Sequence, residues 1–354
     1  MVNSMPESLT QFLEVNSIEA SAPCRIDAGG TWDIKAMALP LESCRPSTVN
    51  IALNLRTRVK LSSYEKGMLK ISSDGFMKSE VYSSGNASFT SSFGIFFAAL
   101  SLFGYEGVEV RISSQAPVKS ALGGSSTALV ALLRALSKVK EKKEGKGLSK
   151  RELLHLAYHI EDGVGGGNCG MQDQAAAVYG GVNLWQWLYS RKACPFERTM
   201  ILDGRGRREL SERILVAYSG KSHVSSVTNR KWIDDFLSGR TRSGWIKANE
   251  IVKELAPALK ESEWARAAGL IKKEMEIRRD ITPEAFIPET EGLIDEAERA
   301  GCGARFSGAG AGGAVWAIGA YDAVQKLRPA WIKVLKKEKG ALMLPCAIDN
   351  SGAG

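Results

Sequence analysis

The sequence lacks the patterns of a secreted, membrane-bound or zinc-binding protein. None of its six cysteines forms a Cys-x-x-Cys pair, which favours scattered reduced thiols over a disulfide framework or a zinc site. The chain does not open on a basic segment followed by an apolar core, and no apolar run approaches the ~20 residues that span a bilayer. We therefore expect a cytoplasmic protein without membrane contact.

Two common phosphate-binding signatures are also missing. No Gly-Lys-Ser/Thr stands at Walker A spacing, and the sequence contains no dinucleotide fingerprint. The formal net charge of +8 is compatible with nucleic acid, a membrane surface or an anionic small molecule. The longest basic stretch, residues 138–150, is broken by Glu141 and Glu144, and no basic stripe is interleaved with aromatics. The sequence therefore predicts no nucleic-acid partner.

Length and patterning predict two domains of mixed secondary structure. The 354 residues, 44% hydrophobic, suit two domains better than one. Strands are expected at 21–28, 49–63, 107–115, 181–188, 213–218 and 304–318, where two strands flank a loop. Helices are expected at 93–103, 125–143, 150–161, 226–238, 243–256, 261–279, 285–300 and within 322–348. Residues 204–208 are interpreted as an exposed turn, so an α+β fold is predicted with domains 1–204 and 205–354.

Residues 120–127, Ser-Ala-Leu-Gly-Gly-Ser-Ser-Thr, lie between a predicted strand and a long predicted helix. Gly123 and Gly124 allow a sharp turn, and the helix N-terminus offers free N–H donors to a phosphate. The hydroxyls of Ser125, Ser126 and Thr127 can cap the helix or hold a magnesium ion. Taken alone, the segment is either an ordinary capped junction or a phosphate site.

Two other segments combine glycines with acidic or apolar residues. Glu161 precedes a glycine-rich loop, and Asp173 follows that loop among small apolar neighbours. A carboxylate in such surroundings is costly unless it is paired or binds a cation, so Asp173 is a candidate for proton handling and Glu161 for a metal. The alternative is a helix cap and a surface residue. Gly308 and Gly310 lie between two strands, which indicates close approach to a ligand or a wide hairpin turn.

Four segments in order together resemble the GHMP kinases, the relatives of galactokinase, homoserine kinase, mevalonate kinase and phosphomevalonate kinase. Ala-Pro-Cys-Arg-Ile-Asp at 22–27 resembles the family's opening strand. Residues 117–126 resemble its Pro-x-x-x-Gly-Leu-Gly-Ser-Ser motif, and residues 303–313 its glycine-rich third motif. Cys-Gly-Met-Gln-Asp-Gln at 169–174 is similar to the Asp-bearing loop of galactokinases and heptose phosphate kinases.

The resemblance implies a fold, a reaction and a set of site residues. The N-terminal domain would resemble the second domain of ribosomal protein S5, and the C-terminal domain would be ferredoxin-like. ATP would transfer its γ-phosphoryl group to a substrate hydroxyl in the cleft between them, with Asp173 orienting the hydroxyl and Arg25 stabilising developing charge. Ser126 and Glu161 would ligate Mg²⁺. The triphosphate would lie on Pro117, Ser120, Ala121, Leu122, Gly123, Gly124, Ser125 and Ser126.

This chain departs from the family motifs at several positions. Ala121 replaces a usual glycine, which is tolerated if its φ is negative. Gly124 replaces a usual Ser or Thr, and Ala311 replaces a glycine of the third motif. Residues 34–47 fit no family pattern, so part of the substrate site is not predicted.

A sugar substrate is indicated by Asp-Ala-Gly-Gly-Thr-Trp-Asp at 27–33, which resembles segments of heptose phosphate kinases and fucokinases. Asp33 can accept two sugar hydroxyls, and Trp32 either offers an apolar face to a pyranose ring or lies in the core. Lys35 and Arg45 mildly favour a phosphorylated sugar. The residues assigned to the substrate are Gly29, Gly30, Thr31, Trp32, Asp33, Gly308 and Gly310.

The expected reaction is phosphorylation of the anomeric hydroxyl of a sugar. A heptose 7-phosphate is the first candidate substrate, and an unphosphorylated hexose such as galactose or fucose is the second. A non-catalytic nucleotide- or sugar-binding relative is the alternative from another class. A monomer or homodimer is expected.

Overall fold

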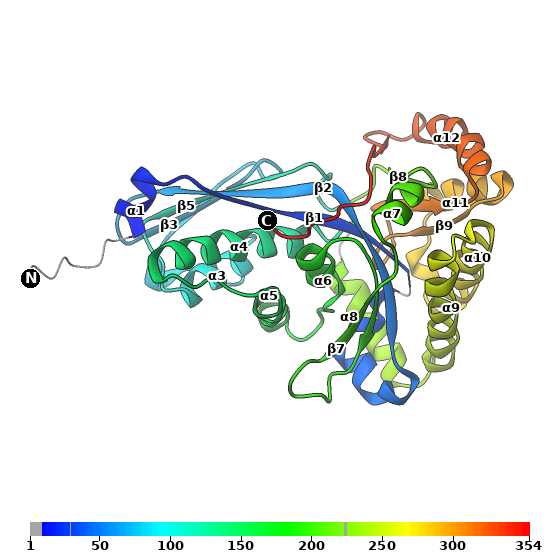
Figure 1. The fold of residues 1–354 in the computed structure, drawn as a ribbon, viewed down its shortest axis with the longest axis horizontal. Coiled ribbons are helices and arrows are strands. Elements are labelled where there is room, and N and C mark those ends of the chain that lie inside the picture. Colours follow the sequence, from blue (N-terminus) through cyan, green and yellow to red (C-terminus); the bar gives the residue numbers. More distant parts are fainter. Residues whose placement is uncertain (1–8, 29, 223–224) are drawn as a thin grey trace, which may run out of the picture.

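In the computed structural model, residues 9–28, 30–222 and 225–354 are described, and they form two parts, each built on a β-sheet (Figure 1). The first sheet has the order β4-β3-β5-β2-β6-β7, with β1 pairing β2. Its strands are β1 (Ile18–Ala28), β2 (Ser47–Ser63), β3 (Met68–Ser73), β4 (Glu80–Ser83), β5 (Val108–Ser114), β6 (Val182–Trp187) and β7 (Phe196–Met200). The second sheet has the order β11-β8-β10-β9. Its strands are β8 (Ile214–Tyr218), β9 (Gly303–Phe306), β10 (Ala314–Ile318) and β11 (Leu342–Met343).

Helices α3, α4, α5 and α6 cover one face of the first sheet (Figure 1). Their bounds are Gly94–Leu102, Gly124–Glu144, Lys150–Val164 and Gln172–Tyr179, and the short α1 spans Leu9–Val15. Left-handed glycines bound α4, Gly123 at φ 74° and Gly145 at φ 77°. The predicted capping box is present, since Ser149 accepts the N–H of Glu152 and Glu152 accepts that of Ser149. Leucines at helical spacing on α4 are fully buried, so the predicted apolar face forms the core.

The second part is largely helical around its small sheet. Its helices are α7 (Gly204–Ser211), α8 (Ser225–Leu237), α9 (Arg242–Lys260), α10 (Trp264–Ile281), α11 (Pro288–Ala300) and α12 (Tyr321–Leu335). The predicted turn at 204–208 is wrong, because these residues begin α7. Asp203 caps that helix by accepting the N–H of Gly206 at 2.8 Å, which offsets the low helix propensity of the two glycines. The two-part α+β organisation is confirmed.

Two segments tie the parts together. Between β1 and β2, the chain forms η1 (Gly30–Asp33), α2 (Lys35–Ala38) and η2 (Leu39–Cys44), and α2 packs against α8. The C-terminal residues return to the first sheet, where the N–H of Gly354 bonds the carbonyl of Ser21 at 3.0 Å. A boundary near residue 205 remains our proposal, with the last residues packed on the first part. Within the described ranges, no helix is long and apolar enough to cross a membrane.

Candidate functional site

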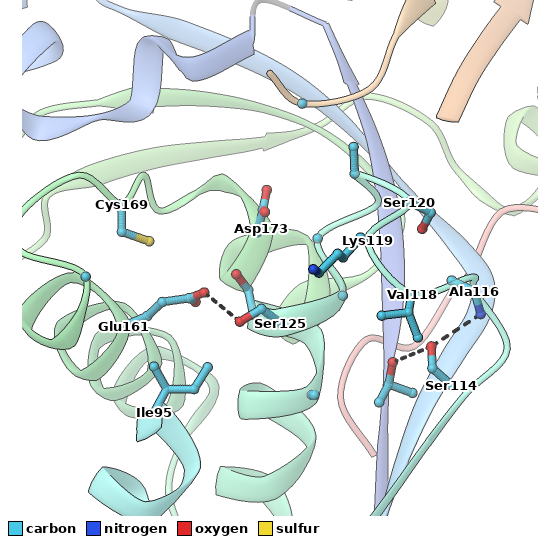
Figure 2. A pocket seen from close by; sticks show the side chains of 18 of the residues that line it. Ile95, Ser114, Ala116, Val118, Lys119, Ser120, Ser125, Glu161, Cys169 and Asp173 are labelled. Atoms are coloured by element: carbon cyan, nitrogen blue, oxygen red, sulfur yellow. Dashed lines mark hydrogen bonds between the residues drawn. The ribbon is translucent and has the colours of Figure 1, made fainter. Parts of the chain in front are cut away.

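A cavity of about 480 Å³ brings together segments that are far apart in the sequence. It is lined from β1, the loop before α4, the N-termini of α4 and α6, the end of α5 and the β9–β10 loop (Figure 2). The predicted site residues that line it are Arg25, Asp33, Pro117, Ser120, Ala121, Gly123, Gly124, Ser125, Ser126, Glu161, Asp173 and Gly308. The separate motifs of the sequence therefore share one cavity.

Three other predicted site residues, Trp32, Leu122 and Gly310, do not line it. Trp32 is 1% exposed and stacks on Trp245, with ring centroids 6.0 Å apart, so the prediction that it offers a face to a sugar is wrong. Leu122 is fully buried in the core, and its carbonyl accepts the N–H of Arg25. Gly310 packs against Ala285 instead of facing the cavity.

Three further predicted residues are only partly described. Gly29 lies outside the described residues. Gly30 and Thr31 belong to η1, whose backbone leads into Asp33.

One end of the cavity is apolar, a feature that the motifs do not predict. Its lining there includes Phe76, Phe93, Phe96, Ile112 and Val118, from β5, α3 and three loops. The pairing of the strands shows how far this apolar end lies from Arg25, which binds Asp173. Ile112 pairs with Val59, which pairs with Ala20 on β1, five residues before Arg25. Five residues of β1 at about 3.3 Å each span ~16 Å, so the cavity runs that far along the sheet from the apolar end to Arg25.

In the loop before α4, every second residue from 119 to 123 has a left-handed backbone conformation. Lys119, Ala121 and Gly123 have φ values of 56°, 60° and 74°. Alanine was expected to be tolerated at position 121 if its φ were negative, and the positive φ of Ala121 does not meet that condition. Its carbonyl accepts a bond from Arg25 Nη1 at 2.6 Å, which anchors the loop to β1. The first turn of α4 lines the cavity, where helix N–H groups have no partner within the helix and can bind an anion.

Asp173 is held by Arg25 at the centre of the cavity. Arg25 Nε and Nη2 lie 2.7 Å and 2.6 Å from Asp173 Oδ1, while Nη1 bonds Ser307 as well as the loop carbonyl. Burial raises the pKa of Asp173 above its usual value, although the charge of Arg25 opposes that shift. All three guanidinium nitrogens of Arg25 are therefore committed to protein groups.

A buried ion-pair chain behind Arg25 links the two parts of the molecule. Asp27, fully buried on β1, accepts Arg305 Nη1 at 2.8 Å and the N–H of Gly308 at 2.7 Å. Arg305 Nε donates to Glu274 Oε2 at 3.1 Å. Burial alone would raise the pKa of Asp27, but Arg305 and Arg25 lower it. No local sequence pattern predicts these ion pairs, because their members come from β1, α10 and β9.

Glu161 is the second carboxylate beside the start of α4. Its oxygens accept Ser125 Oγ at 3.2 Å and Gln174 Nε2 at 2.6 Å (Figure 2). Desolvation raises the pKa of Glu161 to about 7, and the charge of Asp173 adds to the shift. Among the described residues, no group of three or more acidic, His or Cys side chains is arranged so that it could hold a metal ion by itself. The protein therefore offers a cation only a few oxygen ligands here.

Asp33 lies in the cavity wall against the start of α6. Its Oδ2 accepts the N–H of Gln172 at 2.8 Å, and burial raises its pKa to about 7. Gly170 is required beside it, because a Cβ there would lie 1.8 Å from Asp33 Oδ2. The cavity lining also includes the amides Asn168 and Asn229. Sequence reasoning found Asp33 but neither of these amides, which no motif marks.

Gly123→Ala should impair the phosphate site that the sequence predicts at the start of α4, and Gly145→Ala at the other end of α4 should not. Both glycines are left-handed, so each substitution should cost roughly 1–2 kcal/mol of unfolding free energy. Only the Cβ at Gly123 would meet Asp173, at 3.2 Å, whereas the Cβ at Gly145 meets nothing within 4 Å. Steady-state kinetics with ATP, the substrate that the sequence motifs predict, should show a lower kcat/KM in Gly123→Ala alone. Equal kinetic losses in both variants would contradict a specific role for Gly123.

Family models match both parts of the chain. The model described as "GHMP kinases N terminal domain" matches residues 92–181, and "GHMP kinases C terminal" matches residues 255–337. The first contains the loop before α4, Glu161 and Asp173. The second begins in α9 and contains Arg305 and Gly308.

Curated relatives are similar at low identity. A galactokinase from Thermotoga maritima is 26% identical over 69% of this chain and 74% of its own length. A mevalonate kinase from Thermococcus sibiricus is 29% identical over 60% of each chain. A D-glycero-alpha-D-manno-heptose 7-phosphate kinase from Campylobacter jejuni is 26% identical over 64% of each. The chain thus spans less than two thirds of the last two relatives.

Solved structures share the whole fold. Lactococcus lactis galactokinase complexed with galactose superposes with a TM-score of 0.73 at 18% identity, covering 96% of this chain and 95% of that one. Streptococcus pneumoniae phosphomevalonate kinase, in complex with phosphomevalonate and AMPPNP, has a TM-score of 0.75 at 13% identity, covering 95% and 100%. At these identities the likeness establishes the architecture.

Proposed function

Because this chain belongs to the GHMP kinase family, whose N- and C-terminal domains it carries, we propose that it transfers the γ-phosphoryl group of ATP to a hydroxyl of a sugar. The observation that carries this proposal is the placement of Asp173, paired with Arg25, against the N-terminus of α4 in a single cavity. A proton acceptor beside an anion-binding helix terminus suits attack of a hydroxyl on a phosphoryl group.

The cavity offers ATP two matching environments. The apolar end, with Phe93 and Ile112, suits a flat nucleobase, and the first turn of α4 suits phosphates. The AMPPNP in the related phosphomevalonate kinase structure supports a nucleotide of this kind. We therefore place the triphosphate between Val118 and Asp173.

The donor set beside α4 fits a magnesium ion. Mg²⁺ binds oxygen ligands, keeps several waters and is usually held by one or two carboxylates plus substrate phosphates. Burial raises the pKa of Glu161, so its ionised form carries a desolvation cost in this site that a bound divalent cation would offset. Ser126 and Glu161 would hold the ion, which when bound neutralises charge on the phosphates.

Asp173 and Arg25 then act on the acceptor hydroxyl. Asp173 accepts a hydrogen bond from the hydroxyl, which orients its oxygen toward the phosphoryl group, and takes the proton as the new P–O bond forms. The raised pKa of Asp173 makes it a better acceptor than an ordinary aspartate. Arg25 holds the carboxylate in place through two contacts to Oδ1.

The substrate end of the cavity suits a polyol. Asp33 and the amides of Asn168 and Asn229 offer several polar groups in the cavity lining, which rewards a ligand with several hydroxyls. The preference for a phosphorylated sugar rested on the basic balance of the chain and on Lys35 and Arg45. Both residues are exposed and lie outside the cavity lining. We therefore propose an unphosphorylated sugar first and a heptose 7-phosphate second, with the anomeric hydroxyl as acceptor.

Asp33→Ala should lower kcat/KM for the sugar roughly 10- to 100-fold, as expected for losing a hydrogen bond to a charged group. The KM for ATP should stay within about twofold, because the nucleotide lies on the far side of Asp173. Asp280→Ala serves as the control, since this aspartate lies on α10 outside the cavity lining. Initial rates with each substrate varied in turn would show whether the kcat/KM for the sugar falls while the KM for ATP is unchanged. A matching rise in the KM for ATP would argue against a sugar-binding role.

A further inference from the structure

The charges lining the cavity are unbalanced toward the negative. Asp33, Glu161 and Asp173 line it, and the only cationic lining residues in the described part of the chain are Arg25 and Lys119. Arg25 is already bonded through all three guanidinium nitrogens. An incoming triphosphate therefore finds one lining cation with free donors, the ammonium group of Lys119.

The backbone at Lys119 is held in a conformation that favours glycine. Its φ of 56° lies in the left-handed region, where a non-glycine residue costs of order 1–3 kcal/mol. The fold maintains this conformation through anchors on the same loop, including the bond from Arg25 to the carbonyl of Ala121 and that from Ala314 to the carbonyl of Ser120. A lysine serving only as a solvated surface residue would gain nothing from this strain.

The side chain of Lys119 is directed into the cavity. Figure 2 shows it extending from the loop toward the start of α4, where Ser125 lies. The residue is exposed, and no ion pair or hydrogen bond joins its ammonium to another residue in the described part of the chain. Along the loop it stands between Val118, at the apolar end, and Ser120, within the segment where we place the triphosphate.

We propose that Lys119 is a further binding residue for the nucleotide, donating to phosphate oxygens of the triphosphate and neutralising charge there during phosphoryl transfer. This inference rests on the proposed function and deepens it. An ammonium group is a compact point charge with three donors, well suited to oxygens whose charge shifts as the bond to the leaving group breaks. The reaction itself is unchanged, because Lys119 forms and breaks no covalent bond.

The test compares Lys119→Met, Lys119→Gly and Lys119→Arg in the full-length protein. Lys119→Gly relieves the left-handed strain and removes the charge, so its unfolding free energy should equal or exceed that of the wild type. Binding of ATP, ADP and adenosine is measured by calorimetry with Mg²⁺ present. Both neutral variants should bind ATP roughly 10- to 100-fold more weakly and adenosine equally well, as for loss of a charge-assisted hydrogen bond. Lys119→Arg should recover most of the ATP affinity.

Lys35→Met is the matched control, because Lys35 is exposed but lies outside the cavity lining; it should bind every ligand like the wild type. Unchanged ATP affinity in Lys119→Met and Lys119→Gly would overturn the inference. A loss confined to the binding of phosphorylated sugars would also overturn it, by assigning Lys119 to the acceptor. If wild-type protein binds ATP and phosphorylates no sugar, the proposed function fails while the role of Lys119 stands.

Discussion

Asp173→Asn is expected to lower kcat by ~10²–10⁴-fold while leaving ATP affinity near the wild-type value. Asparagine keeps the shape and can still accept a hydrogen bond from Arg25, but it cannot take the proton of the acceptor hydroxyl. The carboxylate of Asp173 is the group that Arg25 holds at the centre of the cavity, at 2.6–2.7 Å. Single-turnover rates and calorimetry would separate the chemical step from nucleotide binding.

Asp162→Asn provides the control for that experiment. Asp162 lies on α5 near the same glycine-rich loop and accepts the N–H of Cys169 at 3.2 Å, but it does not line the cavity. This variant should retain most of the wild-type kcat. A kcat close to the wild-type value in Asp173→Asn would contradict the assignment of Asp173.

Arg305→Met should lower the unfolding free energy by roughly 3–5 kcal/mol, because it removes the closest cationic partner of two buried carboxylates, Asp27 and Glu274. Asp27, Glu274 and Arg305 are each at most 1% exposed, so water cannot replace the lost charge. Chemical denaturation of the nucleotide-free protein would give the change. Activity should also fall, since Asp27 connects Arg305 to Arg25.

The matched control is Arg279→Met at an exposed ion pair. Arg279 pairs with Glu291, with side chains 41% and 39% exposed. Losing such a surface pair typically costs ~0–1 kcal/mol. If both substitutions changed stability equally, the buried chain from Asp27 to Glu274 would not be a specific link between the two parts.

The motif-bearing segments could be located from the sequence, because their glycines and hydroxyls are local signals. The capping box at Ser149 and the glycine before α4 are examples, since each depends only on neighbouring residues. The strands β3, β4 and β7 were not predicted. As a result, Phe76, on the loop after β3, was missed as part of the cavity wall.

The predictions from the sequence that were wrong or incomplete concern residues whose roles depend on contacts between distant parts of the sequence. Trp32 looked available to a sugar, but its packing partners Phe236 and Trp245 come from α8 and α9, some two hundred residues away. Lys119 was passed over for a similar reason. Its importance depends on Arg25 being occupied by Asp173, a pairing that no local pattern reveals.

The most direct test is to incubate the purified protein with ATP·Mg²⁺ and single acceptors, and to identify the product by phosphorus NMR. The acceptors are galactose, fucose, a heptose 7-phosphate, mevalonate and homoserine. We predict ADP release that depends on a sugar, with the new phosphate ester at the anomeric carbon and an unphosphorylated sugar as the better substrate. Phosphorylation of mevalonate or homoserine with no sugar in the panel modified would contradict the proposed function.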